Sequence, residues 1–313
     1  MIPPAVARAV ASVCVTLAAA GVLQVPQPAG PLVSVDVLVT GADGAPVSGL
    51  GKKDFIIVTD AVQRPIVSFT VGKQPLSMLL LLDVTSSVTA KLSRDDLEED
   101  VEEALIDGLN AGERLRIGGF ARHLVLNSGL SSNRRQLRNE LRAAISHRRE
   151  DLFGPSPIWD SAYRAIESLP ATDGRRALIL LTDGRATANV HSIEDVAMMA
   201  TQHGVAVHIV GQDLQYQIRQ DANTALIVRS GNALRWLAAV TGGQFISAID
   251  LQEGPATALT AILAGLRQTY TLTFEAPVAD GRVHALEVQV LRANGQIRAR
   301  NMYVAPLQPA IYP

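Results

Sequence analysis

The sequence contains a single cysteine, Cys14, which lies in an apolar segment near the start of the chain. Residues 1–25 have the features of a secretory leader: one early positive charge, a run rich in Ala, Val and Leu, and small residues around Ala18 to Gly21. We expect a cleaved signal peptide or, because the apolar run is only slightly short of a membrane span, an N-terminal anchor. Removal of the leader would leave no cysteine, which excludes disulfides and thiol catalysis. We therefore expect a secreted, periplasmic or cell-surface location.

The chain also lacks a strong net charge, because 28 Lys and Arg residues stand against 30 Asp and Glu residues. A net charge of -2 gives no general attraction to nucleic acid or anionic lipid. Basic residues do cluster between Asn133 and Glu150, but Leu137, Leu141 and Ile145 repeat there at helical spacing. This pattern predicts an amphipathic helix with a solvated basic face. We expect no nucleic-acid partner and no membrane contact beyond the leader.

The 313 residues, of which 48% are hydrophobic, suffice for one large core and a smaller second one. Residues 32–72 and 267–306 are rich in short β-type runs such as "VSVDVLVT" and "TYTLTFEAP". Neither segment has enough strands to be stable alone. We therefore predict that the two segments pair as halves of one small β-sandwich.

Between these halves, in residues 76–266, unbroken apolar runs such as "SMLLLLD" and "RALILLTDG" alternate with helical patterns. This alternation predicts an α/β domain with a doubly wound, mostly parallel sheet, inserted in the β-sandwich. Ligands of such sheets bind beyond the carboxyl ends of the strands. Asp83 and Asp183 each end an apolar run, so we expect them on the same rim.

Hydroxyl side chains accompany these carboxylates. Thr85 and Ser87 follow Asp83 at two and four residues, and Ser156 lies in a Gly/Pro-containing loop just before a predicted helix. Ligands that are all oxygen suit a hard divalent cation, above all Mg²⁺. The alternative is that Ser86 or Ser87 caps the next helix and Asp83 only ends a strand.

The combination of Asp83-Val84-Thr85-Ser86-Ser87, Ser156 in "GPSPIWDSA" and Asp183 in "LLTDG" resembles the metal-ion-dependent adhesion site (MIDAS) of von Willebrand factor A (VWFA) domains. The likeness is greatest to secreted bacterial VWFA-related proteins. It extends to the leading β segment, to "LRWLAAVTGGQFI" and to "LRQTYTLTFEAP", so it covers nearly the whole chain after the leader.

The resemblance implies a VWFA fold and a non-catalytic adhesion protein. The hydroxyls of Thr85, Ser87 and Ser156 would bind Mg²⁺, Mn²⁺ or Ca²⁺ directly, and Asp83 and Asp183 would act largely through water. An Asp or Glu of a protein partner would complete the coordination. The family usually has Ser at the place of Thr85 and Thr at the place of Ser156. These departures leave a second possibility open, a metal-free structural scaffold whose MIDAS has degenerated.

An enzyme is the remaining alternative, since "DVTSS" after an apolar strand is also similar to the nucleophile loop of haloacid-dehalogenase-like phosphohydrolases. Asp83 would then attack phosphate and Asp183 would hold Mg²⁺. Thr85 stands where those enzymes need a second acid, and no lysine follows Lys91. No glycine-rich phosphate loop is present either. We therefore expect a protein that is not an enzyme.

Overall fold

The computed structural model describes residues 30–307 except 73, 91, 128, 147–148, 212–223, 248–253 and 293–294. The expected leader, residues 1–25, lies outside the described residues. The elements in chain order are β1 (Leu32–Thr40), η1 (Lys52–Asp54), β2 (Phe55–Thr59), β3 (Val62–Arg64), β4 (Ile66–Val71), β5 (Leu76–Asp83), α1 (Ser86–Thr89), α2 (Arg94–Val101), η2 (Glu102–Ile106), β6 (Glu113–Phe120), β7 (Leu124–Leu126), α3 (Arg134–Ile145), α4 (Arg149–Leu152), α5 (Ile158–Glu167), β8 (Arg175–Thr182), α6 (Ile193–His203), β9 (Val205–Gly211), α7 (Thr224–Thr241), β10 (Phe245–Ser247), α8 (Ala256–Arg267), β11 (Tyr270–Glu275), β12 (Val283–Val290), β13 (Gln296–Arg298) and β14 (Met302–Val304).

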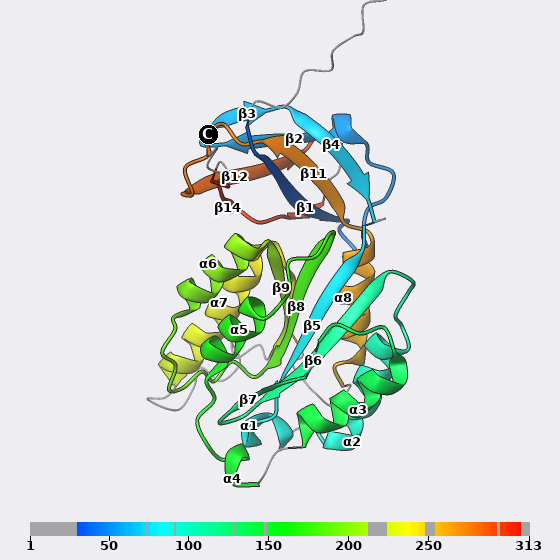
Figure 1. Cartoon of the computed structure of the whole chain (residues 1–313), viewed down its shortest axis with the longest axis vertical. Helices are drawn as coiled ribbons and strands as arrows, with labels where there is room; N and C mark the ends of the chain where they lie inside the picture. The colour runs from blue at the N-terminus through cyan, green and yellow to red at the C-terminus, as the bar shows by residue number, and fades with distance from the viewer. Residues whose placement is uncertain are drawn as a thin grey trace, which may run out of the picture.

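A six-stranded sheet with the order β10-β9-β8-β5-β6-β7 forms the centre of the α/β unit, residues 76–267. Its pairings are parallel except for β7, which runs antiparallel to β6. Every residue of β5 is buried because helices cover both faces of the sheet (Figure 1). Leu80 and Leu82 pack in the core with α2, α3 and α8, whereas Leu79 and Leu81 pack in the core with α5, α6 and α7. The expected α/β architecture with a mostly parallel sheet is confirmed.

The strand order reverses between β5 and β8. The chain proceeds from β5 to β6 on one side and later adds β8, β9 and β10 on the other side. Such a reversal leaves a crevice at the carboxyl ends of the two central strands. Leu82 is paired with Leu181, so Asp83, the last residue of β5, and Asp183, directly after β8, lie at the same edge.

Two four-stranded antiparallel sheets, with the orders β13-β1-β11-β4 and β14-β12-β2-β3, form what we call the β-unit, residues 32–71 and 270–304. Strands from the two ends of the chain pair directly, since β1 pairs with β11 and β13, and β2 pairs with β12. The two sheets share one hydrophobic core that contains Val35, Ile57, Phe274 and Tyr303. Each end of the chain therefore needs the other to bury its apolar side chains.

The β-unit lies at the amino ends of the central strands, opposite the edge that carries Asp83 and Asp183 (Figure 1). Among the helices that the structure describes, none combines the length and the apolar character needed to cross a membrane.

Candidate metal centre

The turn after β5 is organised by the Asp83 carboxylate. Its Oδ1 accepts hydrogen bonds from the backbone N–H of Thr85 at 3.1 Å and from Thr85 Oγ1 at 2.6 Å. Thr85 Oγ1 is also 3.2 Å from Ser87 Oγ. The N-cap of the short helix α1 is Thr85, and its side chain makes no capping bond. The alternative that Ser86 or Ser87 caps this helix is therefore wrong.

The second carboxylate oxygen of Asp83 reaches two further segments. Thr182 Oγ1, at the end of β8, donates to Asp83 Oδ2 at 2.7 Å, and Ser156 Oγ donates to the same oxygen at 3.4 Å. Ser156 is held in turn by its backbone N–H, which donates to Thr187 Oγ1 at 2.8 Å. The fully buried Asp83 thus accepts from hydroxyls of three segments of the chain. Thr182 Oγ1 also accepts from the backbone N–H of Gly184 at 3.1 Å. Because Thr85 and Ser156 direct their protons to Asp83, each of their hydroxyl oxygens keeps a lone pair that can bind another group.

Asp183 presents a buried oxygen without a hydrogen-bond donor. Its Oδ1 accepts from the backbone N–H of Arg185 at 3.1 Å, in a turn that Gly184 closes with a φ of 79°. Its Oδ2 is buried and has no hydrogen-bond partner among the described residues. Arg185 Nε lies 3.6 Å from this oxygen, on a side chain that is 43% exposed. A buried carboxylate oxygen without a hydrogen-bond donor destabilises the folded protein unless a cation lies close to it.

The electrostatic environment of Asp83 also favours a cation. Burial raises the pKa of Asp83 to about 6, although hydrogen bonds from Thr85 and Thr182 act in the opposite direction. The negative charge of Asp183 adds to the effect of burial. The carboxylates of Asp83 and Asp183 are both buried and close enough to influence each other. Their combined negative charge is therefore only partly compensated by hydrogen bonds.

The donor set fits a small divalent cation. Mg²⁺ prefers octahedral coordination by oxygen at about 2.1 Å, so neighbouring ligand oxygens lie about 3.0 Å apart. The separation of 3.2 Å between the Thr85 and Ser87 hydroxyl oxygens is close to that spacing. No cluster of three or more His, Cys, Asp or Glu residues that could hold a metal occurs in the described part of the chain. A metal at this edge would therefore depend on the hydroxyls of Thr85, Ser87 and Ser156, with Asp83 and Asp183 supplying the charge.

Further side chains tie together the loops that carry this site. Asp160, in the first turn of α5, accepts hydrogen bonds from the backbone N–H groups of Val190 and His191 and contacts His191 Nδ1 at 2.7 Å. Asn189 Oδ1 accepts from the backbone N–H of Trp159 at 2.8 Å. These contacts tie the loop after Asp183 to the helix after Ser156. In the sequence, the signal for these contacts was the position of Asp160 in the first turn of a predicted helix, whereas Asn189 reaches α5 from a distant loop.

No protein-family model matches the chain, and no curated protein matches it either. The solved structures similar to it include an aerotolerance-related membrane protein from Bacteroides fragilis NCTC 9343, with 16% identity, a TM-score of 0.44 and coverage of 61% of this chain and 98% of that one. BatB from Bacteroides thetaiotaomicron has 14% identity, a TM-score of 0.42 and the same coverage.

Proximal thread matrix protein 1 from the mussel byssus, solved with a zinc-occupied MIDAS motif, has 15% identity and a TM-score of 0.46. That match covers 66% of this chain and 49% of the mussel protein, so this chain spans about half of its length. Sequence identities and TM-scores this low do not indicate what the site binds. The description of the site therefore depends on the residues of this chain alone.

Proposed function

We propose that this chain is a secreted or cell-surface, non-catalytic interaction protein with a VWFA-like α/β unit. It binds a protein partner through a divalent metal, with Mg²⁺ as the first choice and Mn²⁺ or Ca²⁺ as alternatives. Thr85, Ser87 and Ser156 contribute hydroxyl ligands, Asp83 and Asp183 contribute negative charge, and a partner Asp or Glu completes the coordination. In this proposal the β-unit is a β-sandwich into which the α/β unit is inserted.

One observation carries the proposal. Three hydroxyls and two buried carboxylates from three segments of the chain meet at the switch point between β5 and β8, where one oxygen of Asp183 has no hydrogen-bond partner among the described residues. Neutral hydroxyl ligands do not cancel the charge of a bound dication. Such an ion therefore keeps an affinity for a hard oxygen donor such as a carboxylate.

The burial of Asp83 counts against the phosphohydrolase alternative. Both of its carboxylate oxygens already accept hydrogen bonds, and the residue is fully buried. A nucleophilic carboxylate must present an oxygen to the phosphorus atom of its substrate. The arrangement therefore favours a positioning role for Asp83 over attack on a substrate.

A metal-free scaffold is the second candidate, and Arg185 is the observation that favours it. The guanidinium 3.6 Å from Asp183 Oδ2 is a built-in cation that compensates part of the charge of the site. An ion pair at this distance and with this exposure contributes little, about 0–1 kcal/mol. We therefore place this candidate second.

Calorimetric titration of the purified chain with Mg²⁺ and Mn²⁺ tests the proposal. We expect one metal equivalent to bind the wild type and Asp43→Asn, an exposed carboxylate in the turn after β1. We expect the binding to disappear in Asp183→Asn and Asp83→Asn. If metal binds, acidic peptides should be captured in the presence of metal and released by chelation. Absence of metal binding in the wild type would leave the scaffold as the better account.

A further inference from the structure

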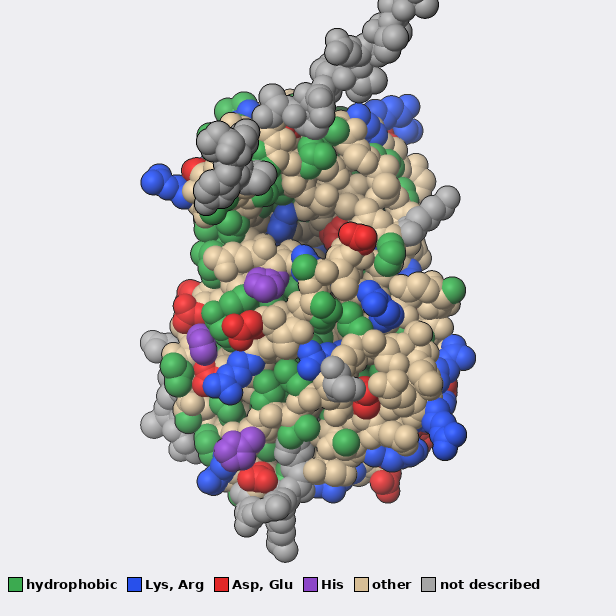
Figure 2. Space-filling model, viewed as in Figure 1, with side chains coloured by type: hydrophobic (Ala, Val, Ile, Leu, Met, Phe, Trp, Pro, Cys, Tyr) green, Lys and Arg blue, Asp and Glu red, His purple; other side chains and the backbone are tan. Residues whose placement is uncertain are grey.

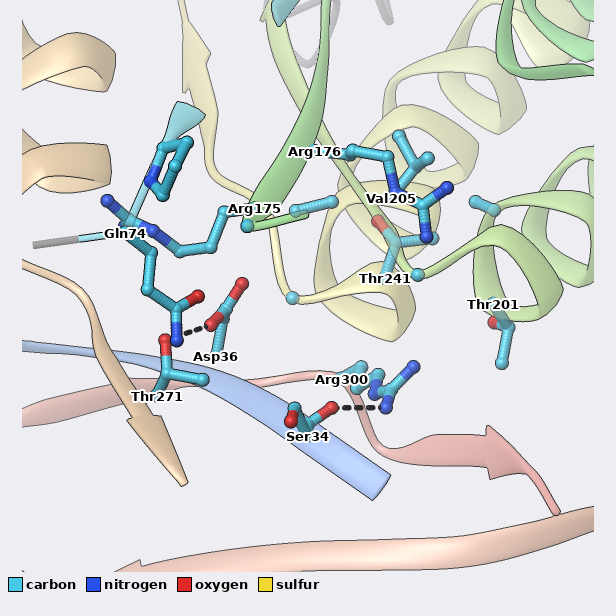
Figure 3. A pocket seen from close by; sticks show the side chains of 16 residues that line it. Ser34, Asp36, Gln74, Arg175, Arg176, Thr201, Val205, Thr241, Thr271 and Arg300 are labelled. Atoms are coloured by element: carbon cyan, nitrogen blue, oxygen red, sulfur yellow. Dashed lines mark hydrogen bonds between the residues drawn. The ribbon is translucent and has the colours of Figure 1, made fainter. Parts of the chain in front are cut away.

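A cavity of about 380 Å³ lies where the β-unit meets the α/β unit. Figure 2 shows that the molecular surface is hollowed between the two units, with charged side chains beside the hollow. Figure 3 shows the side chains that line the cavity, which come from both units. The residues used below are Ser34 and Asp36 of β1, Thr271 of β11, Arg300 before β14, and Arg175 and Arg176 at the start of β8.

Two of the three arginines have an unused donor inside the protein. Arg175 is only 5% exposed and donates through Nη1 to the carbonyl oxygen of Leu266. Arg300 donates through Nη2 to the carbonyl oxygen of Ser34 at 2.5 Å (Figure 3). The Nε atoms of Arg175 and Arg300 are buried, and neither has a hydrogen-bond partner among the described residues. Each guanidinium is therefore anchored by one N–H while another stays unsatisfied.

Positive charge exceeds negative charge among the ionisable side chains of the cavity wall. Asp36 is the one carboxylate among the lining residues, against three guanidinium groups. Its Oδ1 accepts from Thr271 Oγ1 at 2.6 Å. The last turns of α6 and α7 also border the cavity and add partial negative charge. Glu113 also offsets part of the charge of Arg175. Arginine stays protonated even when buried, so three guanidinium groups still leave positive charge at the cavity.

We propose that this cavity binds a small oxyanion, a carboxylate or phosphate group, between Arg176 and Arg300, with Arg175 adding positive charge to the cavity wall (Figure 3). The buried Nε–H groups are out of reach of a ligand, so the oxygens of such a group would accept from Nη–H groups, and planar guanidinium groups match oxyanions well. The volume lies within the range of about 300–1,000 Å³ typical of small-molecule sites. The ligand is therefore a small molecule that carries the oxyanion.

This site is separate from the candidate metal centre. Arg175 begins β8 and Asp183 follows its last residue, so the strand separates the two places by about 23–26 Å. The proposal does not depend on metal binding. The competing explanation is that the arginines only brace the two units through the carbonyl groups of Leu266 and Ser34.

The test is calorimetric titration of the full chain with sodium phosphate and, separately, with disodium succinate, at an ionic strength kept constant with sodium chloride. We expect one equivalent of phosphate or of succinate to bind, or both anions to compete for the same place. The anion that binds identifies the class of oxyanion. Arg176→Gln should weaken this binding by at least about tenfold, since a charge-assisted hydrogen bond is lost. Asp36→Asn should tighten it, because a repelling charge is removed while the acceptor for Thr271 remains. Arg135→Gln, exposed on α3, is the matched control and should bind like the wild type.

Arg176 is preferred for the test because Arg175 and Arg300 also hold backbone carbonyl groups. Asp36→Asn has an expected effect of opposite sign, which a purely structural role does not produce. The proposal is overturned if neither anion gives saturable heat with the wild type, or if the affinity is the same in the wild type, Arg176→Gln and Asp36→Asn.

Discussion

At the scale of single residues, Asp83 has the largest organising role at the candidate metal centre. Its two oxygens accept from Thr85, Thr182 and Ser156, which belong to three different segments. The orientation of each hydroxyl therefore depends on a carboxylate that is itself buried.

Replacing Thr85 with Val removes the hydroxyl group but keeps the shape of the side chain, so it tests the hydroxyl alone. In Thr85→Val, Asp83 Oδ1 keeps only the backbone N–H of residue 85, so the free energy of unfolding should fall by about 1–3 kcal/mol. The affinity for Mg²⁺ or Mn²⁺ should fall by at least about tenfold. Thr85→Ser, which keeps the hydroxyl, should retain metal binding. Calorimetry and urea unfolding measure both effects, and equal metal affinity in Thr85→Val and the wild type would contradict the assignment of Thr85 as a ligand.

Arg185 should oppose the metal, because its guanidinium lies beside the oxygen of Asp183 that lacks a hydrogen-bond donor. Removal of this charge in Arg185→Gln should raise the affinity for Mg²⁺ or Mn²⁺ by about three- to tenfold, as expected for charges separated by several ångströms at a solvated surface. Arg282→Gln, at an exposed arginine of the β-unit and therefore at the opposite end of the central sheet, serves as the control in the same titration. A weaker affinity in Arg185→Gln would mean that Arg185 supports the site instead.

At the scale of elements, the loop between β8 and α6 is held by a side chain of α5. Burial would raise the pKa of Asp160, but the hydrogen bonds from the backbone of His191 and Val190 and from the His191 ring outweigh burial and lower it. Tyr163, one turn further along α5, stacks on the His191 ring at a centroid distance of 3.9 Å. The position of the loop after Asp183 therefore depends on α5.

Loss of the Asp160 carboxylate should loosen this loop. We expect Asp160→Ala to reduce the free energy of unfolding by about 1–3 kcal/mol, since backbone donors lose their acceptor. Hydrogen exchange of the Val190 and His191 amides should become faster. Asp173→Ala, an exposed carboxylate before β8, should leave both quantities unchanged. Unaltered exchange in Asp160→Ala would show that other contacts hold the loop.

The contact between α3 and β6 requires a glycine. A Cβ added at Gly119 would lie 2.2 Å from the carbonyl oxygen of Ala144, which belongs to the backbone of α3. Gly119→Ala should therefore lower the free energy of unfolding by at least about 1–3 kcal/mol. The matched control is Gly129→Ala, where no heavy atom lies within 4 Å of the added Cβ. Thermal or urea unfolding compares the two variants, and equal stability would contradict the close packing of α3 on β6.

At the scale of the whole molecule, the β-unit and the α/β unit meet around several buried ionisable groups. Burial, together with the positive charges of Arg298 and Arg175, lowers the pKa of His208 to about 3. Arg298 belongs to β13 of the β-unit, whereas His208 and Arg175 belong to the α/β unit. The protonation of His208 is therefore governed by how the two units are joined.

This pKa predicts acid sensitivity. The unfolded chain binds a proton at position 208 near the ordinary histidine pKa of about 6.5, whereas the folded chain does not until about pH 3. The contribution of His208 is therefore complete above about pH 6.5 and is lost as the pH falls, by up to about 1.4 kcal/mol per pH unit. Burial of Asp83, whose pKa is raised, acts in the opposite direction, so the comparison must be made against a variant.

Urea unfolding of the wild type and His208→Asn between pH 7 and pH 4 makes this comparison. Asn keeps an acceptor for the backbone N–H of Gln244, which donates to His208 Nδ1 at 3.2 Å. We expect the variant to lose less stability on acidification than the wild type. Parallel loss in the two proteins would contradict the low pKa of His208.

The α/β class followed from local patterns. Runs such as Leu76–Asp83 are apolar at every position, which only a strand covered on both faces can bury, and the alternation of such runs with helices predicts a mostly parallel sheet. The same logic put Asp83 and Asp183 at one edge, and the structure brings Thr85, Ser87 and Ser156 to that edge. That these five residues hold a metal remains a prediction.

Contacts between distant segments could be identified only in the tertiary structure. Thr182 binds Asp83 because β8 pairs with β5, and Asp160 reaches His191 because α5 lies beside the loop after β8. The cavity with three arginines exists only where the chain ends, once paired, meet the amino ends of the central strands. A sequence pattern records which side chains share a face of one element, because that depends on the local backbone period. It does not record which elements become neighbours, because that depends on strand order and on how separate surfaces pack.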